Sequence, residues 1–142
     1  MKKFLTIILA LVMVLSLMAC GSAPAQRPDN GGGVVTDGAI LGEGAHSFTL
    51  EITDADGKTI TAVINTDEET VGAALLKLKV IQGENSSYGL YVKTVNGITA
   101  DYEKDQTYWS FYIDGEYAQT GVDMTAITDG STYKLAIETM AQ

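Results

Sequence analysis

The chain has 142 residues and a formal net charge of −9 at pH 7, from 18 acidic and 9 basic residues. An acidic surface repels phosphate backbones, so we expect no nucleic acid partner. Cys20 is the only cysteine and His46 the only histidine, which excludes a disulfide within one chain and a metal site built from several cysteines. The sequence around His46 offers no nucleophile partner. Counting alone leaves a glycosidase-type pair of carboxylates open, but in so small a domain most carboxylates are more simply solvated surface, and we therefore expect no enzymatic activity.

The N-terminus has the order of a secretory signal. Met1–Lys3 carry positive charge, and residues 4–18 are almost wholly apolar. The stretch ends in the small residue Ala19, just before Cys20, as a cleavage site does. It is short for a hydrocarbon core of roughly 30 Å, and no stop-transfer pattern follows it. The sequence therefore predicts a signal peptide over residues 1–19.

The ending Leu17-Met18-Ala19-Cys20 resembles the bacterial lipobox. This resemblance implies that the Cys20 thiol receives a diacylglycerol, and that acyl chains such as palmitate hold the mature protein to a membrane. Each buried methylene contributes about 0.8 kcal/mol, so several chains make a durable anchor. We therefore expect an extracytoplasmic lipoprotein, anchored to the bacterial cell membrane. The alternative is a plain secretory signal followed by a chance cysteine.

The remainder divides into a tether and one domain. Residues 21–45 are rich in Gly, Pro, Ser, Asn and Asp and show little apolar periodicity, most clearly at Gly31–Gly33. Such composition is typical of a flexible linker, so we assign residues 20–45 to a lipidated tether. Residues 46–142 have a normal size for a single hydrophobic core.

The domain is predicted to open with a β-hairpin. Apolar and polar residues alternate over 48–53 and again over 60–64, which is the period of half-buried strands. Between them, Asp54–Gly57 reads as a turn, because Gly57 can adopt the positive φ that a hairpin bulge needs.

A helix is expected next, from about Glu68 to Val80. Thr66 and Glu69 have the spacing of a capping box. An apolar face repeats at helical spacing, and Gly83 can end the segment. The residues of that face are Val71, Ala74, Leu75 and Leu78.

Further strands follow the helix. The pairs Asn96-Gly97 and Asp114-Gly115 predict tight hairpin turns. The segment 108–113 is aromatic and β-rich, 116–118 can return beside it, and a last strand follows Asp129-Gly130. A hairpin, one helix and a further run of strands is the order of a β-grasp fold. We therefore expect an α+β domain of β-grasp type, with a mixed β-sheet covered by one α-helix.

Several of these segments together resemble the DUF4430 family. The segments that carry the resemblance are Val95-Asn96-Gly97, Tyr108–Gly115, Gly121-Val122 and Asp129–Leu135. The resemblance covers about residues 48–138. It implies a domain similar to the C-terminal β-domain of transcobalamin and intrinsic factor, which hold cobalamin between this domain and an α/α-barrel. No barrel exists in this sequence.

Tyrosines and the single tryptophan are dense for so small a domain. Their rings offer wide apolar area with a polar handle, which suits planar ligands or protein surfaces. We expect some of them to face outward beside the Asp114-Gly115 turn, whose backbone groups offer hydrogen bonds. The candidate ligand-binding residues are Tyr108, Trp109, Tyr112, Asp114, Gly115 and Tyr117. The alternative is that Trp109, Phe111 and Ile113 are core and the tyrosines pack along the strands.

Two classes of function follow from these features. The first is a surface module that captures a corrinoid (a cobalamin-like molecule) or a related small molecule, and delivers it to a transporter. The second is a non-enzymatic module that docks a surface protein or a cell-wall component.

We expect no metal site, since Asp54–Gly57 lacks the spaced ligands and the distal Glu of a calcium loop. No other cofactor is predicted.

The lipid anchor leads to the first prediction. Cys20→Ser removes the thiol that is the acyl acceptor, so the variant should leave the membrane fraction and appear in the soluble fraction. Metabolic labelling with a fatty-acid analogue checks this directly. Equal labelling of the wild type and the variant would contradict it.

Overall fold

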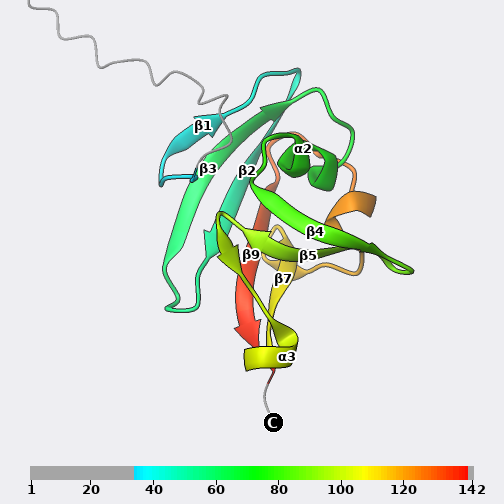
Figure 1. Ribbon diagram of the computed structural model, residues 1–142. Helices are drawn as coiled ribbons and strands as arrows, with labels where there is room; N and C mark the ends of the chain where they lie inside the picture. Colours follow the sequence, from blue (N-terminus) through cyan, green and yellow to red (C-terminus); the bar gives the residue numbers. More distant parts are fainter. Residues whose placement is uncertain (1–33, 141–142) are drawn as a thin grey trace, which may run out of the picture.

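The computed structural model describes residues 34–140 (Figure 1). The predicted signal peptide, the predicted lipidation site Cys20 and Gly31–Gly33 lie outside the described residues. Within residues 34–140, no helix is long and apolar enough to cross a membrane.

A six-stranded mixed sheet, here called the large sheet, forms one layer of the domain. β2 pairs with β3 antiparallel and with β9 parallel, and β1 pairs with β3 parallel. β7 pairs antiparallel with both β9 and β8. The strands in spatial order are β1 (Ala39–Leu41), β3 (Thr59–Thr66), β2 (His46–Thr53), β9 (Thr132–Thr139), β7 (Thr107–Ile113) and β8 (Glu116–Tyr117).

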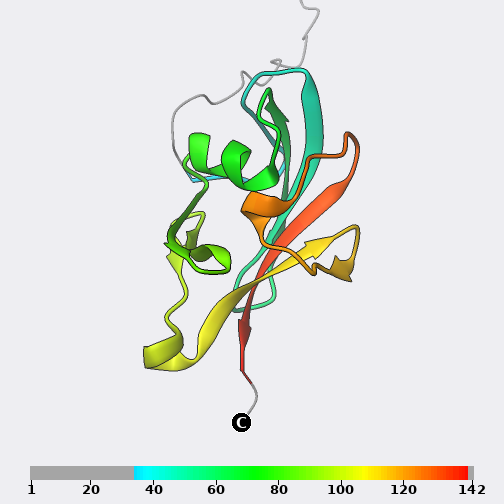
Figure 2. The same ribbon diagram turned by 90° about the vertical axis from the view of Figure 1, so that its right-hand side faces the viewer.

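The second layer covers one face of the large sheet (Figure 2). It holds the helix α2 (Val71–Lys77) and a three-stranded antiparallel sheet, here called the small sheet. The strands of the small sheet are β4 (Ile81–Ser86), β5 (Gly89–Val95) and β6 (Ile98–Thr99). The shorter helices are α3 (Tyr102–Asp105) and the 3-10 helix η1 (Val122–Met124). The expected α+β class with a mixed sheet is thus confirmed.

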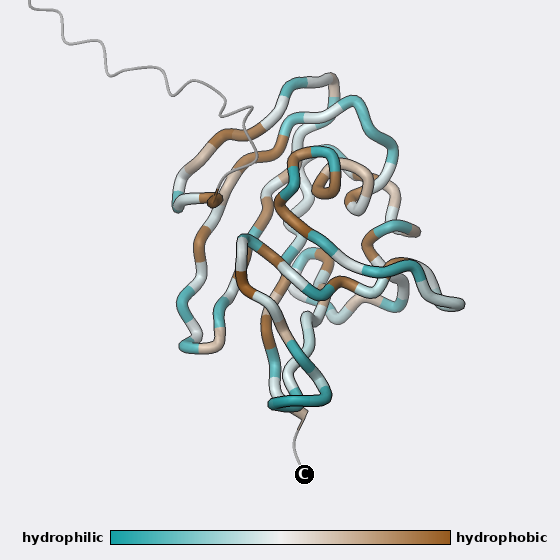
Figure 3. The backbone as a smooth tube through the Cα atoms, viewed as in Figure 1, coloured by the Kyte–Doolittle hydropathy of each residue, from teal (hydrophilic) through white to brown (hydrophobic). Residues whose placement is uncertain are grey.

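The core lies between the two layers. Figure 3 shows apolar and polar residues alternating along the strands of the large sheet, while α3 and the β2–β3 turn are hydrophilic. Phe48 and Leu50 of β2 are each 1% exposed, which confirms the predicted inward face of the hairpin. Tyr133 of β9 is equally buried and meets the Phe48 ring edge-on at 5.2 Å. Its hydroxyl accepts a hydrogen bond from the Thr128 amide at 2.9 Å, so the buried Tyr133 hydroxyl is satisfied.

The helix is shorter than predicted at both ends. Thr70, not Thr66, caps it, and its hydroxyl accepts a hydrogen bond from the Ala73 amide at 3.2 Å. Thr66 instead accepts from the Glu68 amide at 3.0 Å, in the turn before the helix. Lys79 has a φ of 58°, a left-handed conformation that ends the helix well before Gly83.

The apolar face of the helix was predicted correctly. Val71, Ala74 and Leu75 have no exposed surface, and Leu78 packs against the core. Gly72 lies where η1 crosses the helix, and a Cβ at this position would come within 2.7 Å of the Asp123 backbone nitrogen. The helix is therefore held on two sides, by the core and by η1.

The domain begins earlier than predicted. Residues 34–45, which the composition placed in the tether, belong to the fold. Val35 and Leu41 are 3% and 7% exposed, and β1 adds a strand to the edge of the large sheet. Asn96 fixes this segment, since its side chain accepts from the Val35 amide at 2.6 Å and donates to the Val35 carbonyl at 3.0 Å. The predicted domain start at residue 46 is therefore wrong. The sequence pattern missed β1 because a strand of three residues is too short to show an alternation of apolar and polar residues.

β4 was also missed, because all its residues except Ile81 are exposed and most are polar. Its pairing with β5 holds it in place, with a bulge between Gln82 and Gly83. A Cβ at Gly83 would lie 2.2 Å from the Tyr91 carbonyl oxygen, so glycine permits the close approach of the two strands.

The burial of the helix yields the second prediction. Leu75→Ala should lower the free energy of unfolding by about 2–5 kcal/mol, through lost transfer free energy and the cavity left behind. Its neighbour Leu76 is 41% exposed and serves as the matched control. Leu76→Ala should cost less than about 1 kcal/mol. Urea denaturation measures both, and equal costs for the two variants would contradict the orientation of α2.

Candidate ligand-binding surfaces

The aromatic strand β7 divides its rings between two faces. Trp109 and Phe111 point into the core and are 8% and 9% exposed, whereas Tyr108 and Tyr112 lie on the opposite, half-buried side. Trp109 is therefore not on the exposed surface on which the ligand-binding hypothesis placed it. The alternative, in which Trp109, Phe111 and Ile113 belong to the core, is correct for these three residues.

Trp109 joins the two layers instead. Its indole nitrogen donates a hydrogen bond at 3.1 Å to the carbonyl of Lys93 in β5. The same carbonyl accepts from the Ala100 amide at 2.9 Å. A buried indole N–H needs such a partner, and this one ties the small sheet to β7.

Three tyrosines and one glutamate form what we call the tyrosine surface: Tyr108, Tyr112, Tyr117 and Glu138. The β7–β8 hairpin places Tyr117 opposite Tyr112, and their rings meet edge-on at 5.6 Å. Tyr117 is 60% exposed. Glu138 stands opposite Tyr108 in the register between β7 and β9. The surface thus draws on three neighbouring strands, on the side of the large sheet away from the core.

Glu138 organises this surface. The Tyr112 hydroxyl donates to its Oε1 at 2.5 Å, and the Tyr108 hydroxyl donates to its Oε2 at 3.3 Å. The hydrogen bond from Tyr112, helped by the positive charge of Lys134, holds the pKa of Glu138 below its ordinary value. The same hydrogen bond raises the pKa of Tyr112. The Lys134 ammonium lies 5.8 Å from the centre of the Tyr112 ring, so this ring is fixed from three sides.

The Asp114-Gly115 turn is formed as predicted, with positive φ at both residues. The Asp114 carboxylate accepts from the Thr132 amide at 2.8 Å and from the Ser131 hydroxyl at 3.1 Å. The Asp114 amide in turn donates to the Thr132 carbonyl at 2.8 Å. Asp114 therefore fastens the β7–β8 turn to the start of β9, and its role next to the tyrosine surface is structural.

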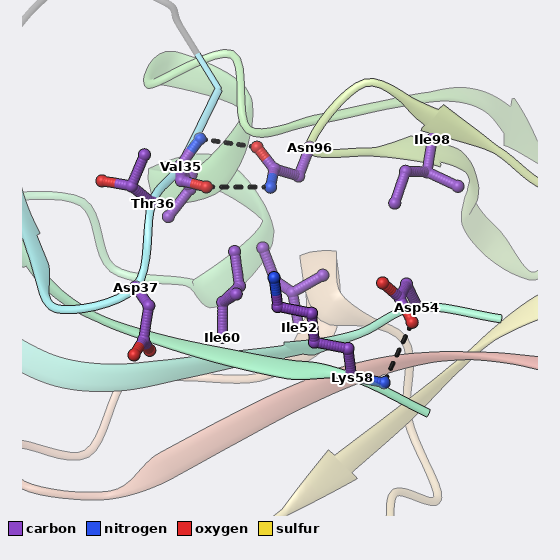
Figure 4. Close-up of a pocket in the computed structure, with 9 residues that line it drawn as sticks. All are labelled: Val35, Thr36, Asp37, Ile52, Asp54, Lys58, Ile60, Asn96 and Ile98. Carbon is purple, nitrogen blue, oxygen red and sulfur yellow. Dashed lines mark hydrogen bonds between the residues drawn. The ribbon is translucent and has the colours of Figure 1, made fainter. Parts of the chain in front are cut away.

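A cleft lies at another edge of the domain, between the two layers (Figure 4). It has a volume of about 310 Å³ and opens where the N-terminal segment, the β2–β3 hairpin and the β5–β6 turn meet. Its lining residues are Val35, Thr36, Asp37, Ile52, Asp54, Lys58, Ile60, Asn96 and Ile98. Sequence reasoning missed this cleft because its residues come from four separate segments.

His46 has a carboxylate neighbour at the surface. Its Nδ1 lies 3.3 Å from Asp129 Oδ1, an atom that also accepts from the Ser47 amide at 2.9 Å. The Ser47 hydrogen bond is the main cause of the lowered pKa of Asp129, and His46 adds to it. In the part of the chain that the structure describes, no three His, Cys, Asp or Glu side chains gather as a group that could hold a metal ion.

The link between Tyr112 and Glu138 gives a pH prediction. Because the folded-state pKa of Glu138 lies below its ordinary 4.5, its stabilising contribution is present at neutral pH and is lost as the pH falls below that value. Tyr112→Phe should therefore lower the free energy of unfolding by about 1 kcal/mol at neutral pH. The difference from the wild type should shrink when urea unfolding is repeated in acid.

Tyr117→Phe is the matched control for this experiment. Within residues 34–140, the Tyr117 hydroxyl has no hydrogen-bond partner, so its removal should leave the unfolding free energy nearly unchanged at every pH. A Tyr112→Phe difference that stays constant down to about pH 3 would contradict the assignment to Glu138.

Comparisons with known proteins place this geometry in context. Residues 68–137 match the model of a domain of unknown function, DUF4430. No curated protein matches the chain at a significant level. A protein from Ruminococcus gnavus ATCC 29149, described as a candidate metal-binding protein, is 27% identical and aligns with a TM-score of 0.65. That alignment covers 68% of this chain and 100% of the other.

A second solved structure, haptocorrin in complex with Cbi, matches 67% of the chain with a TM-score of 0.54 and 16% identity. The match covers 26% of the haptocorrin chain, so the likeness concerns the fold of one part of that protein. The match to DUF4430 and the likeness to haptocorrin confirm the resemblance expected from the sequence. Residues 68–137 therefore match a DUF4430 domain, and the chain is similar in fold to part of haptocorrin, a protein of the transcobalamin family.

Proposed function

We propose that this protein is a non-enzymatic, ligand-binding lipoprotein of the bacterial surface, and that it captures a corrinoid or a related small molecule on the tyrosine surface. The observation that carries the proposal is the fixed position of Tyr112. Its ring is held by Glu138, Lys134 and Tyr117 before any ligand arrives. A preorganised aromatic ring binds at a small cost in conformational entropy, because little freedom remains to be lost.

The likeness to haptocorrin supports the ligand class. The haptocorrin structure contains Cbi, and the part of haptocorrin that this chain resembles has the same fold. A corrinoid is far larger than the cleft of about 310 Å³, so it would need an open surface such as the one around Tyr117. One domain contacts only one side of so large a ligand, and the affinity should therefore be modest.

The finer description of the fold belongs to the same proposal. We assign the domain to the β-grasp type, on the grounds that the β2–β3 hairpin precedes α2 and that β9 returns parallel to β2. The lipid on Cys20 would keep the domain at the membrane. From there it could deliver its ligand to a transporter.

A second candidate function is docking to a protein or a cell-wall component. The observation that favours it is a row of half-buried threonines beside the tyrosine surface, on the same side of the large sheet. These are Thr49, Thr53, Thr61 and Thr132. Together with the tyrosines they offer hydroxyl groups over several strands, which an extended partner could contact.

Titration of the purified protein with cobinamide tests the proposal, with calorimetry as the readout. Tyr112→Ala and Tyr117→Ala should each weaken binding by about two- to tenfold, since an aromatic contact contributes about 0.5–1.5 kcal/mol. Tyr88 lies in the β4–β5 turn and is 93% exposed, so Tyr88→Ala is the matched control and should bind like the wild type. Quenching of Trp109 is a poor readout, because this ring is buried.

The outcomes separate the two candidates. Absence of heat up to about millimolar cobinamide would overturn the corrinoid proposal, since weaker binding is worth less than about 4 kcal/mol. Retention of the protein on isolated cell walls, lost in Tyr117→Ala and kept in Tyr88→Ala, would then support the docking function.

A further inference from the structure

We propose that the cleft in Figure 4 is a second binding site, and that it takes a small zwitterionic molecule with an apolar side chain, such as a free aliphatic amino acid. This site is separate from the tyrosine surface and its ligand belongs to another chemical class. The proposal rests on the size of the cleft, on its apolar wall and on two opposite charges that do not pair with each other.

The volume of the cleft limits the ligand. About 310 Å³ is at the small end of the range for small-molecule sites. An aliphatic amino acid fits within it, whereas a corrinoid does not. The cleft is also open to solvent on one side, so a ligand can enter without any rearrangement of the sheets.

The apolar wall comes from both layers of the domain. Ile52 and Ile60 belong to the large sheet and Ile98 to the small sheet, and all three pack against the core. Ile52 is only 3% exposed and forms the floor. An apolar ligand side chain that covers these residues removes further apolar surface from water, at about 25 cal/mol for each Å².

Lys58 supplies the positive charge. Figure 4 shows its side chain reaching into the cleft toward Ile52 and Ile60. The ion pairs found among residues 34–140 involve His46, Lys77 and Lys93, so the Lys58 ammonium has no carboxylate partner there. An ammonium group beside apolar side chains favours a carboxylate from a ligand, because the attraction is less screened there than in open solvent.

Asp54, which lies in the same β2–β3 turn as Lys58, supplies the negative charge. Its Oδ1 accepts from the backbone amides of Asp56 and Lys58, both at 3.0 Å, which fixes the carboxylate in the turn. Within the described residues, Oδ2 has no hydrogen-bond partner, and it is free to accept from a ligand ammonium. Lys58 and Asp54 line the same cleft without forming an ion pair, and this separation suits the two charges of a zwitterion.

The remaining walls are fixed in place. The two hydrogen bonds between Asn96 and Val35 tie the N-terminal segment to the β5–β6 turn. Asp37, at the rim, accepts from the Thr61 amide at 2.8 Å and so holds this segment to β3. The cleft is therefore formed before the ligand binds. Its two carboxylates, Asp37 and Asp54, disfavour an anion, and a zwitterion is the ligand that also gives the Lys58 ammonium a carboxylate partner.

An NMR titration of the protein with L-leucine tests the proposal. We expect saturable shifts of the amide signals of Lys58, Thr61 and Ile98 and of the Asn96 side-chain amide. N-acetyl-leucine lacks the ammonium group and leucinamide lacks the carboxylate, so each should bind at least about fivefold more weakly. Equal binding of either analogue would overturn the zwitterion assignment.

Variants provide the second arm of the test. Lys58→Met keeps the apolar stem and removes the charge, and Asp54→Asn keeps the acceptor that caps the turn. Each should weaken leucine binding at least about fivefold. Lys104→Met, on α3, is the matched control and should bind leucine like the wild type. Tyr117→Ala should also leave leucine binding unchanged, which separates this site from the tyrosine surface.

Two further results would overturn the proposal. One is the absence of saturable shifts up to about 10 mM leucine, which corresponds to less than about 3 kcal/mol of binding free energy. The other is undiminished leucine binding by folded Lys58→Met and Asp54→Asn, as judged from their NMR spectra.

Discussion

The parallel pairing of β2 with β9 is the constraint on which the rest of the structure depends. It brings the last strand of the domain beside the first long one and places Tyr133 in the core against Phe48. β7 pairs with β9 and β8 with β7, so the β2–β9 contact joins the β1-β3-β2 half of the large sheet to the β9-β7-β8 half. The antiparallel pairing of β7 with β9 sets Glu138 opposite Tyr108. The tyrosine surface therefore depends on the pairing of β7 with both β8 and β9.

The two layers give the domain two different kinds of surface. One side of the large sheet is covered by α2 and the small sheet. The hydrogen bond from the Trp109 indole to the Lys93 carbonyl links this second layer to the large sheet. The opposite side stays open, so its tyrosines are held by side-chain contacts along the strands and by the charge of Glu138. The cleft forms at the margin, where the cover does not reach the end of the β2–β3 hairpin. On the two proposals made above, a broad open surface and a small cleft would select ligands of different sizes on one scaffold.

Local patterns predicted much of the fold. The spacing of apolar residues, which acts over a few positions, predicted the β2–β3 hairpin and the buried face of α2. The turn-forming pairs predicted the turns at Asn96-Gly97 and Asp114-Gly115. Features that depend on pairing between distant segments were missed. β1 and β4 are held by neighbouring strands and carry no clear alternation of their own. The N-cap moved to Thr70 because the chain passes through a further turn before the helix begins.

The candidate site was predicted only in part, because some of its features also depend on pairing between distant segments. The tyrosines of β7 and β8 were recognised by their density, but no local signal tells which side of a strand faces the core when both sides carry aromatic rings. Trp109 was placed outside on that account. Glu138, which orders the surface, was missed because its partners lie about thirty residues away and meet it only through the β7–β9 register.

The most direct measurement is an NMR titration of the protein with cobinamide, followed at every backbone amide. The account predicts saturable shifts at Tyr108, Tyr112, Tyr117 and Glu138, with the signals of Lys58 and Ile98 unmoved. Shifts confined to the cleft, or no shifts at all, would contradict the assignment of ligand binding to the tyrosine surface.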